Sequence, residues 1–183
     1  ALADTLGMCL PGASSIPAAD SGHIRMCAAA GRRIVDMVWE DLTPAKIQTE
    51  AAFRNAIVVA MAMGCSTNAV IHLIAMARRA GHAIGLDDFD AASRDTPVIA
   101  NIRPSGDTYL MEDFYYAGGL LGMMTRLTDR LDLSQINVSG RSWKDSLEGA
   151  AVYNDDVIRT TDNPIYKEGA LAVLRGNLAP QGC

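Results

Sequence analysis

Gly64-Cys65-Ser66-Thr67-Asn68 is followed directly by the apolar run Ala69-Val70-Ile71-His72-Leu73-Ile74-Ala75-Met76-Ala77. The small residues predict a turn that delivers three polar side chains to the first turn of a helix. The first N–H groups of a helix have no hydrogen-bond partner within it. These side chains can accept hydrogen bonds from them, or the N–H groups can bind an anion. Capping is the commoner use, and contact with a ligand is the alternative.

The apolar run itself predicts a helix over residues 67–80. Val70, Leu73, Ile74 and Ala77 share one face, and two arginines in the last turn suit the negative end of the helix dipole. His72 lies on another face, one turn after Asn68. A structural histidine and a catalytic histidine are both compatible with that position.

The rest of the sequence also predicts mostly helices, separated by irregular segments. Helix caps, glycines and prolines mark the boundaries, and short β-branched runs mark two candidate strands. The predicted helices span 21–39 after Asp20 or Ser21, 50–63 after Thr49, 87–93 with Asp87 as the cap, 111–131 with a strain or bend at Gly118 and Gly119, and 143–150 as a short helix. The predicted strands span 97–102 and 170–174.

Composition indicates one globular domain. The chain has 183 residues, of which 49% are hydrophobic and 20% charged, enough to bury one sizeable core. Its longest uncharged apolar run, 56–63, is far shorter than the roughly 20 residues that span a bilayer. A net charge of −5 offers no basic footprint for nucleic acid. We therefore expect a cytoplasmic protein that binds neither nucleic acid nor membrane.

No metal-ligand set is predicted in this chain. The four cysteines contain no Cys-x-x-Cys pair, and we interpret them as reduced, non-ligating thiols. Cys65 is the only one at a helix start, where the thiol pKa tends to fall. The acidic residues Glu112 and Asp113 are best explained as anions at the start of a helix.

Several motifs together carry a family resemblance. Leu86-Asp87-Asp88-Phe89-Asp90, Pro104-Ser105-Gly106 and Met111-Glu112-Asp113 follow the opening stretch in order, and Ala117-Gly118-Gly119 comes next. In this order they resemble the dihydroxy-acid and sugar-acid dehydratase family, with the branch of L-arabinonate dehydratase closest. The resemblance extends to both ends of the chain through Leu6-Gly7-Met8, Leu10-Pro11-Gly12, Gly31-Arg32-Arg33-Ile34-Val35 and Gly176-Asn177-Leu178-Ala179.

The resemblance implies an α/β fold, of which this chain is a mostly helical interior fragment. Residues 1–160 would form the later part of an N-terminal α/β/α domain. Residues 161–183 would form a linker and the strand that leads to a C-terminal β-barrel-like domain. The full-length protein would be a hydro-lyase with a [2Fe–2S] cluster and Mg²⁺ whose ligands lie outside this chain, and the fragment alone would be inactive.

The implied reaction removes a C2 proton and the C3 hydroxyl of a sugar acid, giving an enol that becomes a 2-keto-3-deoxy acid. The alternatives are dihydroxy-acid dehydratase of branched-chain amino acid synthesis, and a segment that serves only as scaffold and dimer surface. We assign no catalytic residue here and expect Ser66, Thr67, Asn68 and His72 to line the substrate site. A homodimer or homotetramer is expected, with the aromatic stretch Tyr109 to Leu121 at the interface.

Overall fold

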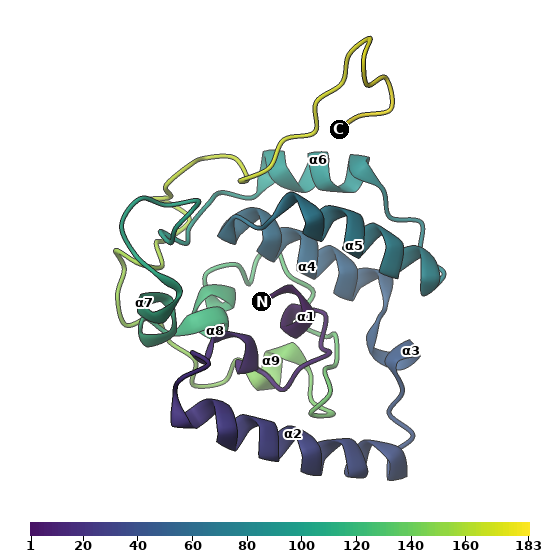
Figure 1. Cartoon of the computed structure of the whole chain (residues 1–183), viewed down its shortest axis with the longest axis vertical. Coiled ribbons are helices and arrows are strands. Elements are labelled where there is room, and N and C mark those ends of the chain that lie inside the picture. Colours follow the sequence, from purple (N-terminus) through teal and green to yellow (C-terminus); the bar gives the residue numbers. More distant parts are fainter.

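The computed structural model describes residues 1–183, which form nine α-helices and one 3-10 turn joined by long irregular segments (Figure 1). The irregular segments are concentrated in the second half of the chain. The elements are α1 (Leu2–Thr5), η1 (Ala13–Ser15), α2 (Ser21–Trp39), α3 (Pro44–Ile47), α4 (Glu50–Met63), α5 (Thr67–Arg79), α6 (Leu86–Asp95), α7 (Met111–Tyr116), α8 (Gly119–Thr125) and α9 (Trp143–Ser146).

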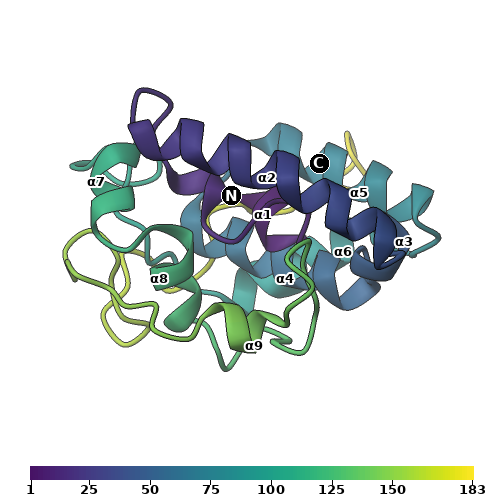
Figure 2. The same ribbon diagram turned by 90° about the horizontal axis from the view of Figure 1, so that it is seen from below.

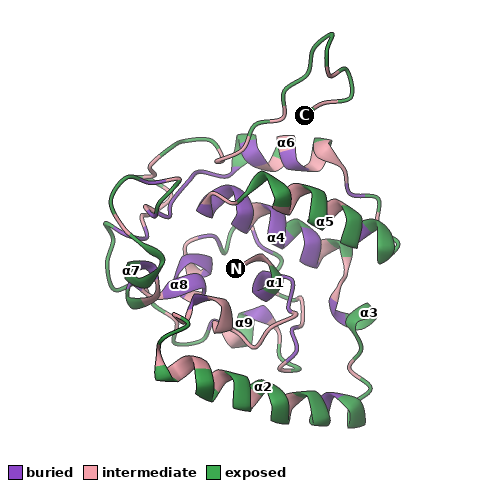
Figure 3. Ribbon diagram, in the orientation of Figure 1, coloured by how far each residue is buried: buried purple, intermediate pink, exposed green.

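Helix α4 is the centre of the molecule. It begins where the Thr49 side chain accepts a hydrogen bond from the Ala52 N–H at 3.1 Å, and it ends at Gly64, whose φ of +79° reverses the chain. Ten of its fourteen residues are buried. Figure 3 shows this helix largely in the colour of buried residues, with α5 and α6 above it and α8 below it. The sequence prediction for this helix and its two ends is confirmed.

Two apolar clusters meet at α4. The larger one joins Val59, Ala62 and Met63 to the buried side of α8 and to Trp143 of α9. The other joins Phe53, Ile57 and Met61 to Leu73 of α5 and Phe89 of α6. The predicted inner face of α5 is confirmed, because Leu73 and Ala77 are buried and Val70 and Ile74 are half-buried.

Helix α2 lies lengthwise along one edge, as Figures 1 and 2 both show. The Asp20 carboxylate caps it by accepting from the Gly22 N–H at 2.6 Å, and the helix ends at Trp39, as predicted. Only Met37 of this helix is buried. No helix of the structure is both long enough and apolar enough to cross a membrane.

The two predicted strands are not formed, and residues 1–183 contain no β-strand. In the segment 97–102, Val98 bridges Tyr166, Ala100 bridges Ile158 and Ile102 bridges Tyr109, each as an isolated pair. The segment is extended and buried, but its hydrogen bonds go to the Ala62 carbonyl of α4 and to several irregular stretches instead of one neighbouring strand. The described residues are therefore mostly helical, and the C-terminal barrel-like domain stays a prediction.

The predicted helix 111–131 is broken into α7 and α8. Gly118 adopts a φ of +121° and Gly119 a φ of +60°, conformations that favour glycine. A Cβ at Gly118 would come within 2.3 Å of the Ala151 carbonyl oxygen. The predicted bend and close backbone packing are confirmed, but the bend is sharp enough to end the helix.

The C-terminal segment crosses α6 and then extends beyond the helices (Figure 1). The Gly169 N–H donates to the Ser93 carbonyl at 2.6 Å, and Arg175 pairs with Asp87. Residues 170–174 form no strand here. The division of the chain near residue 160 stays a prediction.

Candidate functional site at the start of helix α5

The polar residues before α5 do act as a helix cap. The Ser66 hydroxyl accepts a hydrogen bond from the Asn68 N–H at 3.3 Å, and Ser66, Thr67 and Asn68 are all exposed. The predicted helix start is confirmed. The Ala69 N–H donates to the Ser66 carbonyl at 2.9 Å, whereas the N–H of the exposed Thr67 makes no hydrogen bond. The contact with substrate stays a prediction.

A second motif packs against this turn. A Cβ added to Gly64 would lie 1.8 Å from the Ser105 hydroxyl oxygen, so the Pro104-Ser105-Gly106 loop lies directly against the Gly64 backbone. Gly106 is equally confined, since a Cβ there would lie 2.4 Å from the Asn101 Oδ1. Ser105 is therefore a site-forming residue that sequence reasoning missed. The signal in the sequence was that both motifs contain a glycine, Gly64 in one and Gly106 in the other. Glycine allows another part of the chain to approach the backbone closely.

His72 and Thr67 lie beside different hollows of the surface. His72 is exposed and lines a cavity of about 340 Å³ with Leu6 and Met76. Thr67 lines a cavity of about 320 Å³ together with Phe89 and Leu171. The structure thus keeps Ser66, Thr67 and Asn68 together at the helix start and places Thr67 and His72 on different sides of α5.

The acidic motifs have structural partners. The Asp88 carboxylate accepts from the Gly85 N–H at 2.9 Å and pairs with Arg54 at 2.9 Å, so Asp88 caps α6. The prediction that Asp87 is the cap is wrong, because α6 begins one residue earlier and Asp87 lies inside it. The Asp113 carboxylate accepts from the Leu110 N–H at 2.8 Å, which confirms the helix-start interpretation.

The cysteines and carboxylates do not converge on a metal site. All four cysteines are free, and no three side chains of His, Cys, Asp or Glu are close enough to hold an ion. Burial raises the pKa of the Cys9 and Cys65 thiols, which disfavours the thiolate form that binds metal. The position of Cys65 before a helix does not overcome this desolvation.

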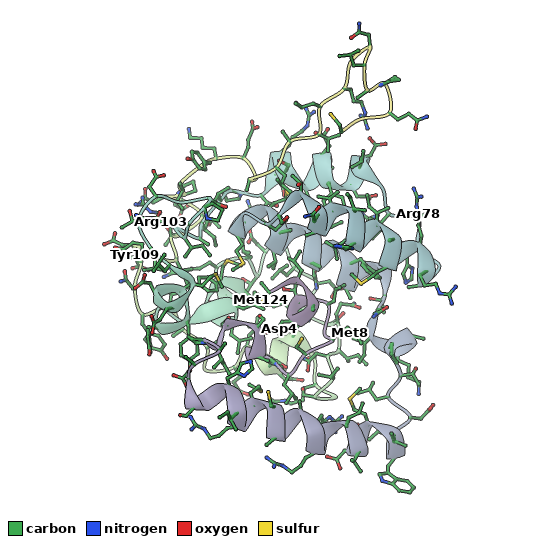
Figure 4. All side chains as sticks on the ribbon, viewed as in Figure 1. Asp4, Met8, Arg78, Arg103, Tyr109 and Met124 are labelled. Carbon is green, nitrogen blue, oxygen red and sulfur yellow. The ribbon has the colours of Figure 1, made fainter.

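Asp4 is a buried carboxylate that sequence reasoning did not single out (Figure 4). Its Oδ2 accepts from the Ser14 N–H at 3.1 Å and from the Ser14 hydroxyl at 2.9 Å, whereas Oδ1 has no hydrogen-bond partner. Burial raises the pKa of Asp4 above its ordinary 3.8, and the hydrogen bonds from Ser14 oppose that rise. Burial therefore makes the Asp4 carboxyl harder to ionise than an exposed one.

Asp4 predicts a pH dependence of stability. A carboxyl with a raised pKa in the folded state contributes most below the ordinary value of 3.8, and that contribution is lost as the pH rises through the folded-state pKa. We expect the free energy of unfolding to fall less steeply with rising pH in Asp4→Asn. This variant keeps a side-chain oxygen that can accept from Ser14. The measurement is the free energy of unfolding between pH 4 and 7, with the exposed Asp107→Asn as control. An equally steep fall of the free energy of unfolding in Asp4→Asn would show that Asp4 does not cause the pH dependence.

The aromatic stretch 109–121 divides between core and surface. Phe114 and Leu120 are fully buried, whereas Tyr116 is exposed and its ring lies 5.3 Å from that of Tyr115. Part of the stretch is therefore core, and its role as an interface stays a prediction.

Known proteins match this chain along nearly its whole length. The family described as dihydroxy-acid/6-phosphogluconate dehydratase N-terminal matches residues 1–146. The 6-deoxy-6-sulfo-D-gluconate dehydratase of Pseudomonas putida is 50% identical over 99% of this chain and 32% of its own length. The L-arabinonate dehydratase of Rhizobium leguminosarum bv. trifolii is 47% identical over 98% of this chain and 31% of its own length.

A relative with another substrate is nearly as similar. The dihydroxy-acid dehydratase of Acetivibrio thermocellus is 42% identical over 99% of this chain and 33% of its own length. The chain thus spans about a third of the length of the curated relatives it matches. With a family match over residues 1–146, the chain belongs to the dihydroxy-acid/6-phosphogluconate dehydratase N-terminal family.

Proposed function

We propose that this chain is part of a hydro-lyase that dehydrates a sugar acid, an aldonate such as L-arabinonate, to a 2-keto-3-deoxy acid. The observation that carries the proposal is the identity of 50% and 47% to two sugar-acid dehydratases, against 42% to a dihydroxy-acid dehydratase. Water leaves as the C3 hydroxyl and the C2 proton, and the resulting enol rearranges to the ketone.

The second candidate is the dehydration of a dihydroxy acid in branched-chain amino acid synthesis. It is favoured by the 42% identity to a dihydroxy-acid dehydratase over almost the whole chain. The two candidates share the reaction and differ in the group attached to C3. A segment that serves only as scaffold is compatible with either, because this chain contributes no assigned catalytic residue.

The cofactors of the full-length enzyme are part of the proposal. A [2Fe–2S] cluster and Mg²⁺ would supply the electrophile that helps a hydroxide leave, which is otherwise a poor leaving group. The side chains of this chain do not fit either group, because no three of its His, Cys, Asp or Glu side chains lie close enough together to hold a metal ion. We propose that the ligands lie elsewhere in the full-length protein.

The proposed contribution of this chain is to hold the substrate carboxylate. The Thr67 N–H makes no hydrogen bond and lies at the positive end of the α5 dipole, which attracts an anion. Thr67 and Asn68 would add side-chain donors there, and Ser105 would fix the turn from behind. His72 would then contact the substrate away from its carboxylate.

The substrate class is tested on the full-length protein. L-Arabinonate, 6-deoxy-6-sulfo-D-gluconate and 2,3-dihydroxyisovalerate are offered separately, and the 2-keto acid formed is measured. We expect kcat/KM for one of the sugar acids to exceed that for the dihydroxy acid by at least about tenfold, the ratio that about 1.4 kcal/mol of differential binding gives. A preference for 2,3-dihydroxyisovalerate would establish the second candidate, and no 2-keto acid from any of them would contradict both.

Substitutions at the α5 cap test the role of this chain. We expect Ser66→Ala to lower the free energy of unfolding by about 1 kcal/mol, because it removes the cap. If the helix start binds the carboxylate, Ser66→Ala and Asn68→Ala should also raise KM by about tenfold or more, since a hydrogen bond to a charged group is involved. Arg79→Ala, at the opposite end of α5, is the control. Wild-type kinetics in both cap variants would defeat the assignment.

A further inference from the structure

The segment from Leu171 to Leu174 has the side-chain pattern of a strand that packs on one face. Leu171 and Val173 are half-buried and pack against the apolar cluster that α4 shares with α5 and α6, whereas Ala172 and Leu174 are exposed. This alternation has the period of two that an extended chain gives. Figure 1 shows the segment passing across α6 before the chain loops outward. The segment therefore has one packed face, although no strand lies beside it.

The backbone groups of this segment point alternately to two sides. The Leu171 carbonyl accepts a hydrogen bond from the Ser93 hydroxyl, so it faces α6. On the other side, the Leu174 N–H donates to the Cys183 carbonyl and the Cys183 N–H donates to the Leu174 carbonyl, each at 2.9 Å. Because backbone groups alternate along a strand, Ala172 faces the same side as Leu174. Ala172 makes no hydrogen bond there.

The pair formed by Leu174 and Cys183 is the base of a hairpin. Two reciprocal hydrogen bonds of this kind join directly opposite residues of antiparallel strands. Between the two residues the chain turns back at Gly176 and Ala179, whose N–H groups donate to each other's carbonyl at 3.4 and 3.2 Å. At Cys183 the chain therefore runs antiparallel to the segment, in the direction of Ala172.

An apolar cavity lies beside the returning chain. It measures about 320 Å³, and its walls include Val70 of α5, Phe89 of α6 and Cys183. Opposite residues of an antiparallel pair place their side chains on the same face, and both Cys183 and Leu174 are exposed. Since side chains alternate along a strand, the first residue after Cys183 points to the packed face, where the cavity lies.

We propose that the residues directly after Cys183 in the full-length protein pair, as an antiparallel strand, with residues 171–174. The second residue after Cys183 lies opposite Ala172 and bonds to its N–H and carbonyl. The first residue after Cys183 fills the cavity with an apolar side chain. The pairing ends at Ala172, because the Ala170 N–H already donates to the Met61 carbonyl at 3.2 Å.

The occupant of this edge is a continuation of the same chain, because Cys183 already lies in the paired position beside it. This chain spans about a third of the length of its curated relatives, which extend well beyond the matched part. The pairing does not depend on the reaction or on the substrate. It has one consequence for the candidate site: the cavity beside Thr67 is filled by protein and is closed to the substrate.

Engineered disulfides in the full-length protein test the register. In a background of Cys65→Ser and Cys183→Ser, Ala172→Cys is combined with a cysteine at the second residue after Cys183. We expect an intramolecular disulfide on oxidation, since opposite residues have Cα atoms about 5.5 Å apart. The matched control has its second cysteine at the fourth residue after Cys183, about 7 Å further along the strand and out of reach. Peptide mass spectrometry locates the linkage. Equal oxidation of the two variants, no disulfide in the first, or a linkage between two copies would overturn the proposal.

Amide hydrogen exchange of the unaltered full-length protein tests the pairing without any substitution. The N–H groups of Ala172 and Val173 both lack a partner in this structure, and only that of Ala172 faces the proposed strand. We expect the protection factor of the Ala172 amide to exceed that of the Val173 amide by about tenfold or more. Mass spectrometry with fragmentation to single residues measures both. An unprotected Ala172 amide, or equal protection of the two, would show that the residues after Cys183 lie elsewhere.

Discussion

Replacing Gly64 by alanine is expected to lower the free energy of unfolding by about 3–5 kcal/mol, combining a strained backbone with overpacking. The φ of +79° at Gly64 is unfavourable for any residue with a Cβ. The new methyl group would also lie 1.8 Å from the Ser105 hydroxyl oxygen and 2.4 Å from its Cβ. Rotation of the serine relieves only the first contact, so the backbone must move.

Two further variants separate the two causes. Gly81→Ala shares the positive φ, at +89°, but meets no atom within 4 Å, so it should cost only about 1–2 kcal/mol. Adding Ser105→Gly to Gly64→Ala should recover much of the difference, because both clashing atoms are removed. Urea unfolding of the full-length protein measures all three. Equal losses for Gly64→Ala and Gly81→Ala would mean that Ser105 does not pack against the turn.

Trp143→Ala is expected to lower the free energy of unfolding by a similar amount, about 3–5 kcal/mol. Trp143 is fully buried and belongs to the larger apolar cluster, together with Leu131 and Leu147. Truncation would leave a cavity that a helix as short as α9 cannot close. The same urea unfolding experiment measures the loss.

Trp143→Phe should be much milder, below about 1.5 kcal/mol. The indole Nε1 is buried without a hydrogen-bond partner, so removing it also removes an unsatisfied donor. The exposed Tyr153→Ala should change stability by less than about 0.5 kcal/mol. A mild effect of Trp143→Ala would mean that α9 is not part of the cooperative core.

The helices that sequence reasoning predicted well are those with local signals at both ends. Asp20, Thr49 and Ser66 each cap a helix through a hydrogen bond to a residue two or three positions on. The stop at Gly64 is local too. Such contacts can be recognised from spacing alone.

The features that sequence reasoning missed depend on distant partners. The extended segment 97–102 has the composition of a strand, but its hydrogen bonds are made with Ala62 of α4 and with irregular stretches from other parts of the chain. The break at Gly118 follows from the approach of the Ala151 carbonyl. Neither partner could be identified from the local pattern.

The candidate site, too, could be predicted only where it depends on local sequence. The cap formed by Ser66 could be predicted, and so could the exposed position of Asn68. The separation of Thr67 and His72 follows from what packs on either side of α5, namely the C-terminal segment on one side and α1 on the other. Ser105 joins the site only through the fold.

The position of α4 between the two apolar clusters has a consequence for how the molecule opens. Phe53 and Ile57 serve one cluster, and Val59 and Ala62 serve the other, all on a single helix of fourteen residues. Helix α4 cannot unfold without removing the packing of both clusters, because each uses a different side of the same backbone. Partial unfolding that spares one cluster is therefore suppressed, and the amide hydrogens of α4 should exchange with solvent only when the whole unit unfolds.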